Sequence, residues 1–143
     1  MPSDAMLKFV NGLHRGLVKI SGGRIGWSGG GMPVVELTTT GRKSGQARTV
    51  MLTSPYQEDD TIVIVASRGG DPTHPAWFLN LRDHPEVEAI FKGRPKRTMH
   101  AHIADADERA RLWPLVTSAQ PRYGEYQKKT TREIPLVLLK PTP

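Results

Sequence analysis

Cysteine is absent from the sequence, which removes disulfide bonds, zinc–thiolate sites and thiol nucleophiles together. No apolar run is long enough to cross a bilayer, and Lys8, His14 and Arg15 interrupt the apolar positions where a signal peptide would lie. No glycine-rich dinucleotide motif, P-loop or nucleophile elbow follows a predicted strand. We therefore expect a cytoplasmic protein without the sequence motifs of the common nucleotide-binding folds and serine hydrolases.

The composition is that of an ordinary globular domain with a basic surface. The 143 residues are 37% hydrophobic and 24% charged, with a formal net charge of +6. This charge predicts an anionic partner. The three Trp, three Tyr and three Phe do not interleave with basic residues on one predicted strand, as a base-stacking platform would require. A nucleic-acid-binding barrel is therefore a remote alternative, and we expect no nucleic-acid partner.

The N-terminal part has a different character from the rest of the chain. Apolar residues of segment 4–20 recur at helical spacing, and Lys8, Arg15 and Lys19 lie on the other side. Such an amphipathic helix can touch a membrane surface peripherally, but we favour a lid packed on its own domain. Glycines then dominate the connection to the first predicted strand. We divide the chain into residues 1–32, a helix with a glycine-rich linker, and 33–143, the core domain.

The core domain is predicted to be mainly β. A continuous apolar run at 61–66 indicates a strand covered on both faces. A helix is expected at 75–82 with Pro75 in its first position, and another at 105–119 with a capping box formed by Asp105 and Glu108 and a kink at Pro114. Short connections between the strands favour an antiparallel, partly closed barrel with short helices packed on it. The predicted strands are 34–38, 49–53, 61–66, 86–91, 98–103 and 134–139.

Residues 38–48 connect two predicted strands and gather three cations, Arg42, Lys43 and Arg48, around a tight turn. Like charges repel one another, so an anionic ligand is the simplest reason to collect them there. The alternative is a solvated basic hairpin.

Residues 65–80 form a second block of interest, in which a buried strand ends in Ser67 and Arg68 and glycines follow. Glycines allow a backbone to approach a ligand closely. Trp77 and Asn80 lie on one face of the helix that follows; the alternative is that Trp77 is a core residue and Asn80 a capping residue. Together with the 38–48 loop, this block can line one positive cleft.

Metal chemistry finds little support in the sequence. His100 and His102 share a strand face, but no third ligand occurs at a matching spacing, so we expect no metal site. A chain without an evident nucleophile, metal or acid pair, but with an anion-gathering loop, points to a bound cofactor that supplies the chemistry.

Three motifs resemble the deazaflavin-dependent nitroreductase family of actinobacteria: TTTGRKSGQAR at 38–48, ASRGG with HPAWFLNL at 66–81, and QPRYGEYQKKTTREIPLVLL at 120–139. The resemblance implies a split β-barrel, similar to the FMN-binding, pyridoxamine-phosphate-oxidase-like proteins. It also implies coenzyme F420, an 8-hydroxy-5-deazaflavin with a phosphodiester and glutamate tail. The implied activity is hydride transfer to an electrophilic small molecule: a nitroaromatic, a quinone or an α,β-unsaturated ester or lactone.

The resemblance also assigns roles to matching residues. Ser67, Tyr123 and Tyr126 would donate hydrogen bonds to the acceptor, with Tyr123 capping the substrate side; a packing pair of the two tyrosines is the alternative. Cofactor binding would fall to four segments: Arg42, Lys43, Ser44 and Arg48 for the tail; Thr49, Val50, Met51, Leu52 and Thr53 beside the ring; Val65, Ala66, Ser67 and Arg68 on the opposite wall; and Ala76, Trp77, Phe78, Leu79 and Asn80 near the start of the tail. Tyr123 would also contact the cofactor.

Two further expectations accompany the resemblance. Split barrels of the related flavin families are commonly dimers, so we expect a homodimer. The chain departs from the family pattern at Val50-Met51, Thr53 and Gln120, positions that face the substrate, so cofactor binding carries over better than substrate choice. A non-catalytic F420 carrier with the same cleft is the alternative function, and an FMN-dependent oxidoreductase is a remote one.

Overall fold

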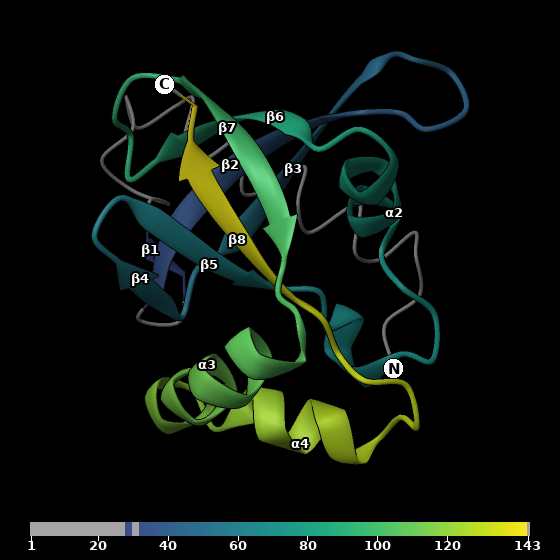
Figure 1. Ribbon diagram of the computed structural model, residues 1–143, viewed down its shortest axis with the longest axis vertical. Helices are drawn as coiled ribbons and strands as arrows, with labels where there is room; N and C mark the ends of the chain where they lie inside the picture. The colour runs from purple at the N-terminus through teal and green to yellow at the C-terminus, as the bar shows by residue number, and fades with distance from the viewer. Residues whose placement is uncertain (1–27, 30–31, 143) are drawn as a thin grey trace.

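The computed structural model describes residues 28–29 and 32–142, which form a curled antiparallel sheet with helices at its rim (Figure 1). Neighbouring strands follow the order β1-β2-β6-β7-β8-β5-β4, and β3 pairs with β2 outside this path. The strands are β1 (Ser28–Gly29), β2 (Met32–Thr40), β3 (Ala47–Thr53), β4 (Tyr56–Glu58), β5 (Thr61–Val65), β6 (Glu86–Phe91), β7 (Arg97–Ile103) and β8 (Leu136–Pro141).

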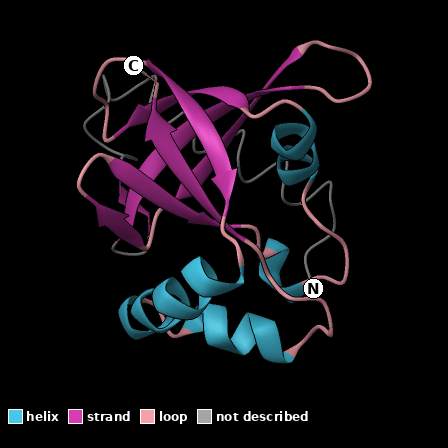
Figure 2. Cartoon of the chain, in the orientation of Figure 1, coloured by secondary structure: helices cyan, strands magenta, loops and turns pink. Residues whose placement is uncertain are grey.

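The helices occupy two places around the sheet (Figure 2). Helix α2 (Ala76–Asp83) lies beside the end of the β2–β3 hairpin, and helices α3 (Ala106–Ala119) and α4 (Arg122–Lys128) lie together below β5 and β8. A short 3-10 helix, η1 (Arg68–Gly70), lies between β5 and α2 in the chain.

Strand β5 divides the apolar interior into two cores, because successive side chains of a strand point to opposite faces. Ile62 and Ile64 join the barrel core, which also contains Trp77, Phe78 and Leu81 of α2. Its other face, with Val63 and Val65, joins a second core that contains Leu112 and Val116 of α3 and Tyr123 of α4. The prediction that this apolar run is covered on both faces is confirmed.

The predicted barrel is confirmed, with small shifts of element ends. The 38–48 hairpin forms in the register Thr38↔Thr49 and Thr40↔Ala47. Helix α2 begins at Ala76, with Pro75 as its N-cap rather than its first residue. The last strand begins at Leu136 rather than 134, directly after Pro135, which has no N–H to give to the sheet.

Some elements lay outside the sequence prediction. Strand β4 is short, and helix α4 contains Gly124 and lacks a side-chain cap, so neither has a strong sequence signal. Residues 28–29 pair with the start of β2, so this part of the predicted linker belongs to the sheet. The predicted helix 4–20 lies outside the described residues, and the division of the chain at residue 32 stays a prediction. Within the described ranges, no helix combines the length and apolar character needed to cross a membrane.

Helix α3 begins with the predicted capping box. The Asp105 carboxylate accepts from the Glu108 N–H at 2.9 Å, and the Glu108 carboxylate accepts from the Asp105 N–H at 3.0 Å. The helix continues through Pro114, although this residue cannot donate a backbone hydrogen bond.

We expect Asp105→Ala to lower the free energy of unfolding by about 1 kcal/mol, because the first turn of α3 loses its cap. Asp107→Ala is the matched control, since Asp107 is also an exposed carboxylate of this first turn but is not part of the box. Urea unfolding of both variants measures the difference. Equal destabilisation by the two substitutions would contradict the role of the box.

Candidate functional site

Asn80 joins the two sequence blocks that we predicted to form one site. Its side-chain oxygen accepts from the Arg42 backbone N–H at 3.1 Å, and its side-chain nitrogen donates to the Thr39 hydroxyl at 3.2 Å. The Thr39 hydroxyl in turn donates to the Arg48 carbonyl at 3.4 Å. We call the turn that carries Arg42, Lys43 and Arg48 the basic loop. Because Asn80 is only 6% exposed, this buried network fixes helix α2 against the base of the basic loop.

The basic loop has no carboxylate to neutralise it locally. No acidic residue occurs between Glu36 and Glu58 in the sequence. In the described part of the chain, the side chains of Arg42, Lys43 and Arg48 form no hydrogen bond or ion pair. Ser44 accepts from the Gln46 N–H at 3.2 Å, which shapes the turn. The loop is thus a group of unpaired cations suited to phosphate or carboxylate oxygens.

Strand β3 has one edge without a partner strand among the described residues. The Ser54 N–H donates to the Pro33 carbonyl and the Gly41 N–H donates to the Gln46 carbonyl, which sets the alternation of hydrogen-bonded pairs along the hairpin. By this alternation, the backbone groups of Val50 and Leu52 face β2. Those of the alternate residues, Thr49, Met51 and Thr53, face the open edge.

The side chains of β3 alternate in the same way. Val50 and Leu52 pack against the barrel core, so they can offer a ligand neither a side chain nor a backbone N–H. Thr49, Met51 and Thr53 point to the opposite face of the strand. Among the five residues predicted to lie beside the cofactor ring, these three are therefore the ones whose backbone N–H groups lack a partner strand in the described part of the chain.

Strand β5 leads through Ala66 and Ser67 into a left-handed turn at residues 68–70. Val65 and Ala66 are buried, and Ser67 is 8% exposed. The Ser67 hydroxyl forms no hydrogen bond with any described residue. A buried hydroxyl without a partner is uncommon and calls for an explanation such as a ligand. Arg68 follows with a φ of 46° and binds Asp71 at 3.3 Å.

The residues of α2 that were predicted to contact the cofactor differ in burial. Trp77 and Phe78 are 8% and 5% exposed and belong to the barrel core, as the structural alternative for Trp77 anticipated. Leu79 is half-buried, and Ala76 is exposed. Asn80 is a network residue, and its contacts with the loop give it a direct part in shaping the site.

Tyr123 and Tyr126 of α4 form a T-shaped pair with ring centroids 5.9 Å apart. The Tyr123 hydroxyl lies 3.7 Å from the Met32 sulfur, and burial raises its pKa against the opposing effect of a hydrogen bond with Thr53. Tyr126 packs on the turn after Ser67, because a Cβ on Gly70 would lie 2.8 Å from the Tyr126 carbonyl oxygen. The tyrosines therefore connect the open edge of β3 to the Ser67 turn.

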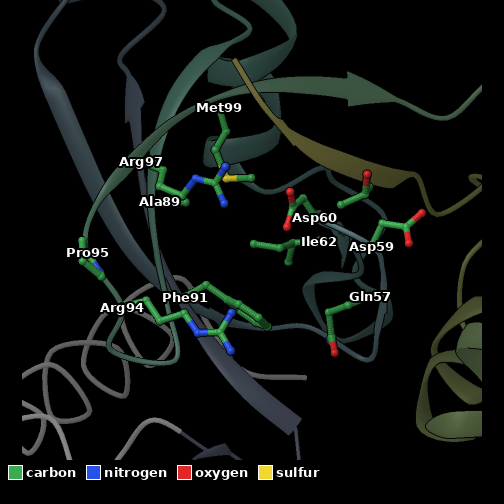
Figure 3. A pocket seen from close by; sticks show the side chains of 11 residues that line it. Gln57, Asp59, Asp60, Ile62, Ala89, Phe91, Arg94, Pro95, Arg97 and Met99 are labelled. Atoms are coloured by element: carbon green, nitrogen blue, oxygen red, sulfur yellow. The ribbon is translucent and has the colours of Figure 1, made fainter. Parts of the chain in front are cut away.

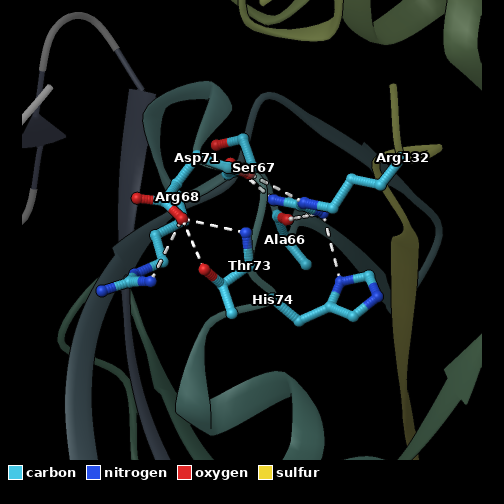
Figure 4. A network of polar contacts seen from close by, with 7 residues as sticks. All are labelled: Ala66, Ser67, Arg68, Asp71, Thr73, His74 and Arg132. Carbon is cyan, nitrogen blue, oxygen red and sulfur yellow. Dashed lines mark hydrogen bonds and ion pairs between the residues drawn. The ribbon is translucent and has the colours of Figure 1, made fainter. Parts of the chain in front are cut away.

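Arg132 is a site residue that the sequence prediction missed (Figure 4). Its guanidinium donates to the carbonyls of Ala66 at 3.2 Å, Ser67 at 2.9 Å and Asp71 at 2.9 Å. A further contact of 3.1 Å joins it to the His74 Nδ1. Its one sequence signal is that it falls inside the third motif. An arginine between two polar residues does not by itself show which carbonyls it holds.

A cavity of about 70 Å³ opens elsewhere, near the turn between β6 and β7 (Figure 3). Phe91 and Arg94 line it, and Phe91 pairs with Val35 near the start of β2. The basic loop follows the end of β2 at Thr40, about 16 Å farther along the strand. This cavity is therefore separate from the basic loop.

The two histidines considered as metal ligands, His100 and His102, each pair with a different carboxylate. His100 lies 2.8 Å from Glu86, and His102 lies 2.6 Å from Glu108 of the capping box. Among the described residues, no group of three or more candidate ligands gathers.

The fold is that of a split barrel with a cluster of unpaired cations among its described residues, and comparison with known proteins identifies its family. Residues 13–141 match the F420H(2)-dependent quinone reductase family, so the chain belongs to it. The F420H(2)-dependent quinone reductase Rv1261c of Mycobacterium tuberculosis is 43% identical over 89% of this chain and 87% of its own length. The family match confirms the predicted class, an oxidoreductase that uses coenzyme F420.

Similar solved structures agree with this family and with the predicted fold. An F420-H2 dependent reductase, FDR-A, is 38% identical with a TM-score of 0.67 over 76% of this chain and 94% of its own. A structure described as a domain-swapped dimer is 39% identical with a TM-score of 0.68, over 76% of this chain and 80% of its own. A protein of the pyridoxinephosphate oxidase family from Clostridium acetobutylicum, 9% identical over 90% of this chain and 84% of its own, has a TM-score of 0.52 and shares the fold alone. The predicted split β-barrel is confirmed.

Asn80→Ala should cost about 2 kcal/mol of stability, because the Arg42 N–H and the Thr39 hydroxyl lose a buried partner. Amide hydrogen exchange adds a local readout: the Arg42 amide should lose protection. The Ser54 amide, which is bonded to Pro33 at the other end of the hairpin, is the internal control and should stay protected. Unchanged protection at Arg42 would show that Asn80 does not hold the loop.

Proposed function

We propose that this chain reduces a quinone-type small molecule with a hydride supplied by reduced coenzyme F420. The observation that carries the proposal is a set of donors without a hydrogen-bond partner among the described residues, which we call the donor track. It comprises the side chains of Arg42, Lys43 and Arg48, the open-edge amides of Thr49, Met51 and Thr53, and the Ser67 hydroxyl.

The first part of the donor track suits the cofactor tail. Phosphodiester and glutamate oxygens are anionic, and guanidinium groups pair with both in a two-point geometry. Arg42, Lys43 and Arg48 have no competing intramolecular partner among the described residues, so binding a ligand breaks no ion pair. Asn80 holds the loop backbone in place before the ligand arrives, which lowers the entropy cost of binding.

The second part of the donor track suits the ring. The open-edge amides run from Thr49 to Thr53 over about 13 Å. Backbone N–H groups at a strand edge remain strong donors that need a partner, and ring carbonyls are suitable acceptors. We assign Thr49, Met51 and Thr53 to ring binding, while Val50 and Leu52 support them from the core.

The acceptor would lie between the Ser67 turn and the tyrosines. Negative charge that develops on a quinone oxygen during reduction is stabilised by a donor held in advance in a dry site. Ser67 has a buried hydroxyl available for this, and Tyr123 and Tyr126 are the further candidates. Because burial raises the pKa of Tyr123, this phenol keeps its proton and acts as a hydrogen-bond donor rather than as a base. Water can supply the proton to the product.

Two predictions about partners stay proposals. A homodimer is supported by the similar structure described as a domain-swapped dimer. Peripheral membrane contact through residues 4–20 concerns a segment outside the described residues, and nothing in the fold supports it.

Arg48→Ala should weaken F420 binding by about tenfold at low salt, and by less at high salt, because an ionic contact with the tail is lost. Arg97→Ala is the matched control, since Arg97 is an exposed arginine at the start of β7, away from the loop. Titration followed by cofactor fluorescence, with FMN as the competing cofactor, measures the affinity. Equal affinity in both variants would remove Arg48 from the site, and a preference of the unaltered chain for FMN would overturn the cofactor assignment.

Ser67→Ala should lower kcat for menadione reduction by up to about 100-fold, the effect of losing one such donor. Its stability should not change, because the Ser67 hydroxyl has no described intramolecular partner. Ser54→Ala is the contrasting control, since the Ser54 hydroxyl bonds to the Val63 carbonyl at 2.6 Å inside the fold. It should lower stability and leave kcat intact. Unchanged turnover in Ser67→Ala would exclude the serine as a catalytic donor.

A further inference from the structure

The turn after β5 holds the backbone in an unfavourable conformation. Arg68, Gly69 and Gly70 have φ angles of 46°, 65° and 84°, three left-handed residues in succession. Arg68 has a Cβ, so this conformation costs about 1 kcal/mol or more and persists only when the surroundings impose it. Ser67 directly precedes the turn, so the position of its hydroxyl depends on what imposes this conformation.

The carbonyls on both sides of the turn converge on one side chain. Ala66, Ser67 and Asp71 all accept hydrogen bonds from Arg132, which comes from the segment between α4 and β8 (Figure 4). The planar guanidinium offers five N–H donors in a fixed fork, so it can serve several acceptors at once. No lysine could satisfy all three carbonyls from one nitrogen with the same geometry.

The His74 ring completes the set of acceptors. An arginine can only donate, so the His74 Nδ1 that faces Arg132 must carry a lone pair. Burial lowers the pKa of His74, and the nearby charges of Arg132 and Arg82 lower it further, which keeps the ring neutral. Phe78 of the barrel core supports this ring, with centroids 4.7 Å apart.

We propose that Arg132 is a positioning residue for the reaction: by holding the carbonyls of Ala66, Ser67 and Asp71, it maintains the strained turn that places the Ser67 hydroxyl against the acceptor. This inference rests on the proposed function, because it assumes that Ser67 faces the substrate. It adds a residue that does not itself lie on the donor track.

Arg109 provides a matched control for the loss of a half-buried arginine. It donates to the Ile134 carbonyl at 3.0 Å and to the Gln127 side chain at 3.1 Å, and its guanidinium lies 4.3 Å from the Trp113 ring centroid. It therefore supports the same C-terminal segment as Arg132, but none of its described contacts reaches the turn. Arg109→Ala reports the cost of loosening that segment alone.

The experiment compares Arg132→Ala with Arg109→Ala in two measurements. In the cofactor-free protein, amide exchange should accelerate at Gly70 and Asp71, whose N–H groups bond within the turn, only in Arg132→Ala. With F420H2 and menadione, assayed well below each variant's melting temperature, kcat should fall by up to about 100-fold in Arg132→Ala and stay near that of the unaltered chain in Arg109→Ala. Millimolar guanidinium chloride should restore part of the lost kcat only in Arg132→Ala, because it resupplies the missing donors.

Each outcome decides between the two proposals. If Arg132→Ala matches Arg109→Ala in both exchange and kcat, or if guanidinium restores nothing, the positioning role is wrong. If Arg132→Ala does not fold, Arg132→Lys takes its place and should show the same loss of kcat, since one ammonium cannot hold three carbonyls. If the unaltered chain itself fails to reduce menadione with F420H2, the proposed function fails, whereas normal reduction with no difference between the variants removes the role of Arg132 alone.

Discussion

The two-sided burial of β5 is the constraint on which the rest of the structure depends. Alternate side chains of Ile62–Val65 enter the barrel core and the core under α3 and α4. A strand that is apolar on both faces can be stable only where both faces are covered, so it fixes helix α2 and the α3–α4 pair relative to one sheet. The turn that begins after Ser67 lies at the end of β5, next to both cores. Ser67 is therefore placed by the same strand that forms both cores.

Some cations of this fold form ion pairs, and those of the basic loop do not pair with any described residue. Arg111 pairs with Glu58, Arg68 with Asp71 and Lys128 with Glu125. The three cations of the 42–48 segment are different, because within the described chain they face no carboxylate. Exposed ion pairs contribute little to stability, so leaving these cations unpaired costs the fold almost nothing. It leaves a local positive field that attracts an anionic ligand, which agrees with membership of a family named for a cofactor with an acidic tail.

Local patterns were sufficient to predict most of the barrel. The apolar run of β5, the glycine turn between β2 and β3 and the capping box of α3 each lie within a few residues, so their physics can be read from neighbouring positions. Strand β4 and helix α4 were missed because they are short and are stabilised by tertiary packing rather than by intrinsic propensity.

The candidate site was predictable only in part for the same reason. The cation cluster is visible in the sequence, but the separation of Thr49, Met51 and Thr53 from Val50 and Leu52 requires the register of the hairpin. The role of Arg132 depends on contacts with residues about 60 positions away, and no local pattern encodes contacts at that separation.

The strained turn at Arg68 explains why so many separate elements converge on this corner of the fold. A left-handed residue with a Cβ would relax if it were held only by its neighbours in the chain. Here Arg132 holds the carbonyls, Asp71 holds the Arg68 side chain and Tyr126 packs over Gly70. Helix α4 covers one face of β5, and this packing also brings α4 and the Arg132 segment next to the turn. The strain of the turn is therefore compensated by contacts of elements that also stabilise the core. The chain can thus keep the buried Ser67 hydroxyl without a partner among the described residues, and this is the group that we propose as the hydrogen-bond donor to the substrate.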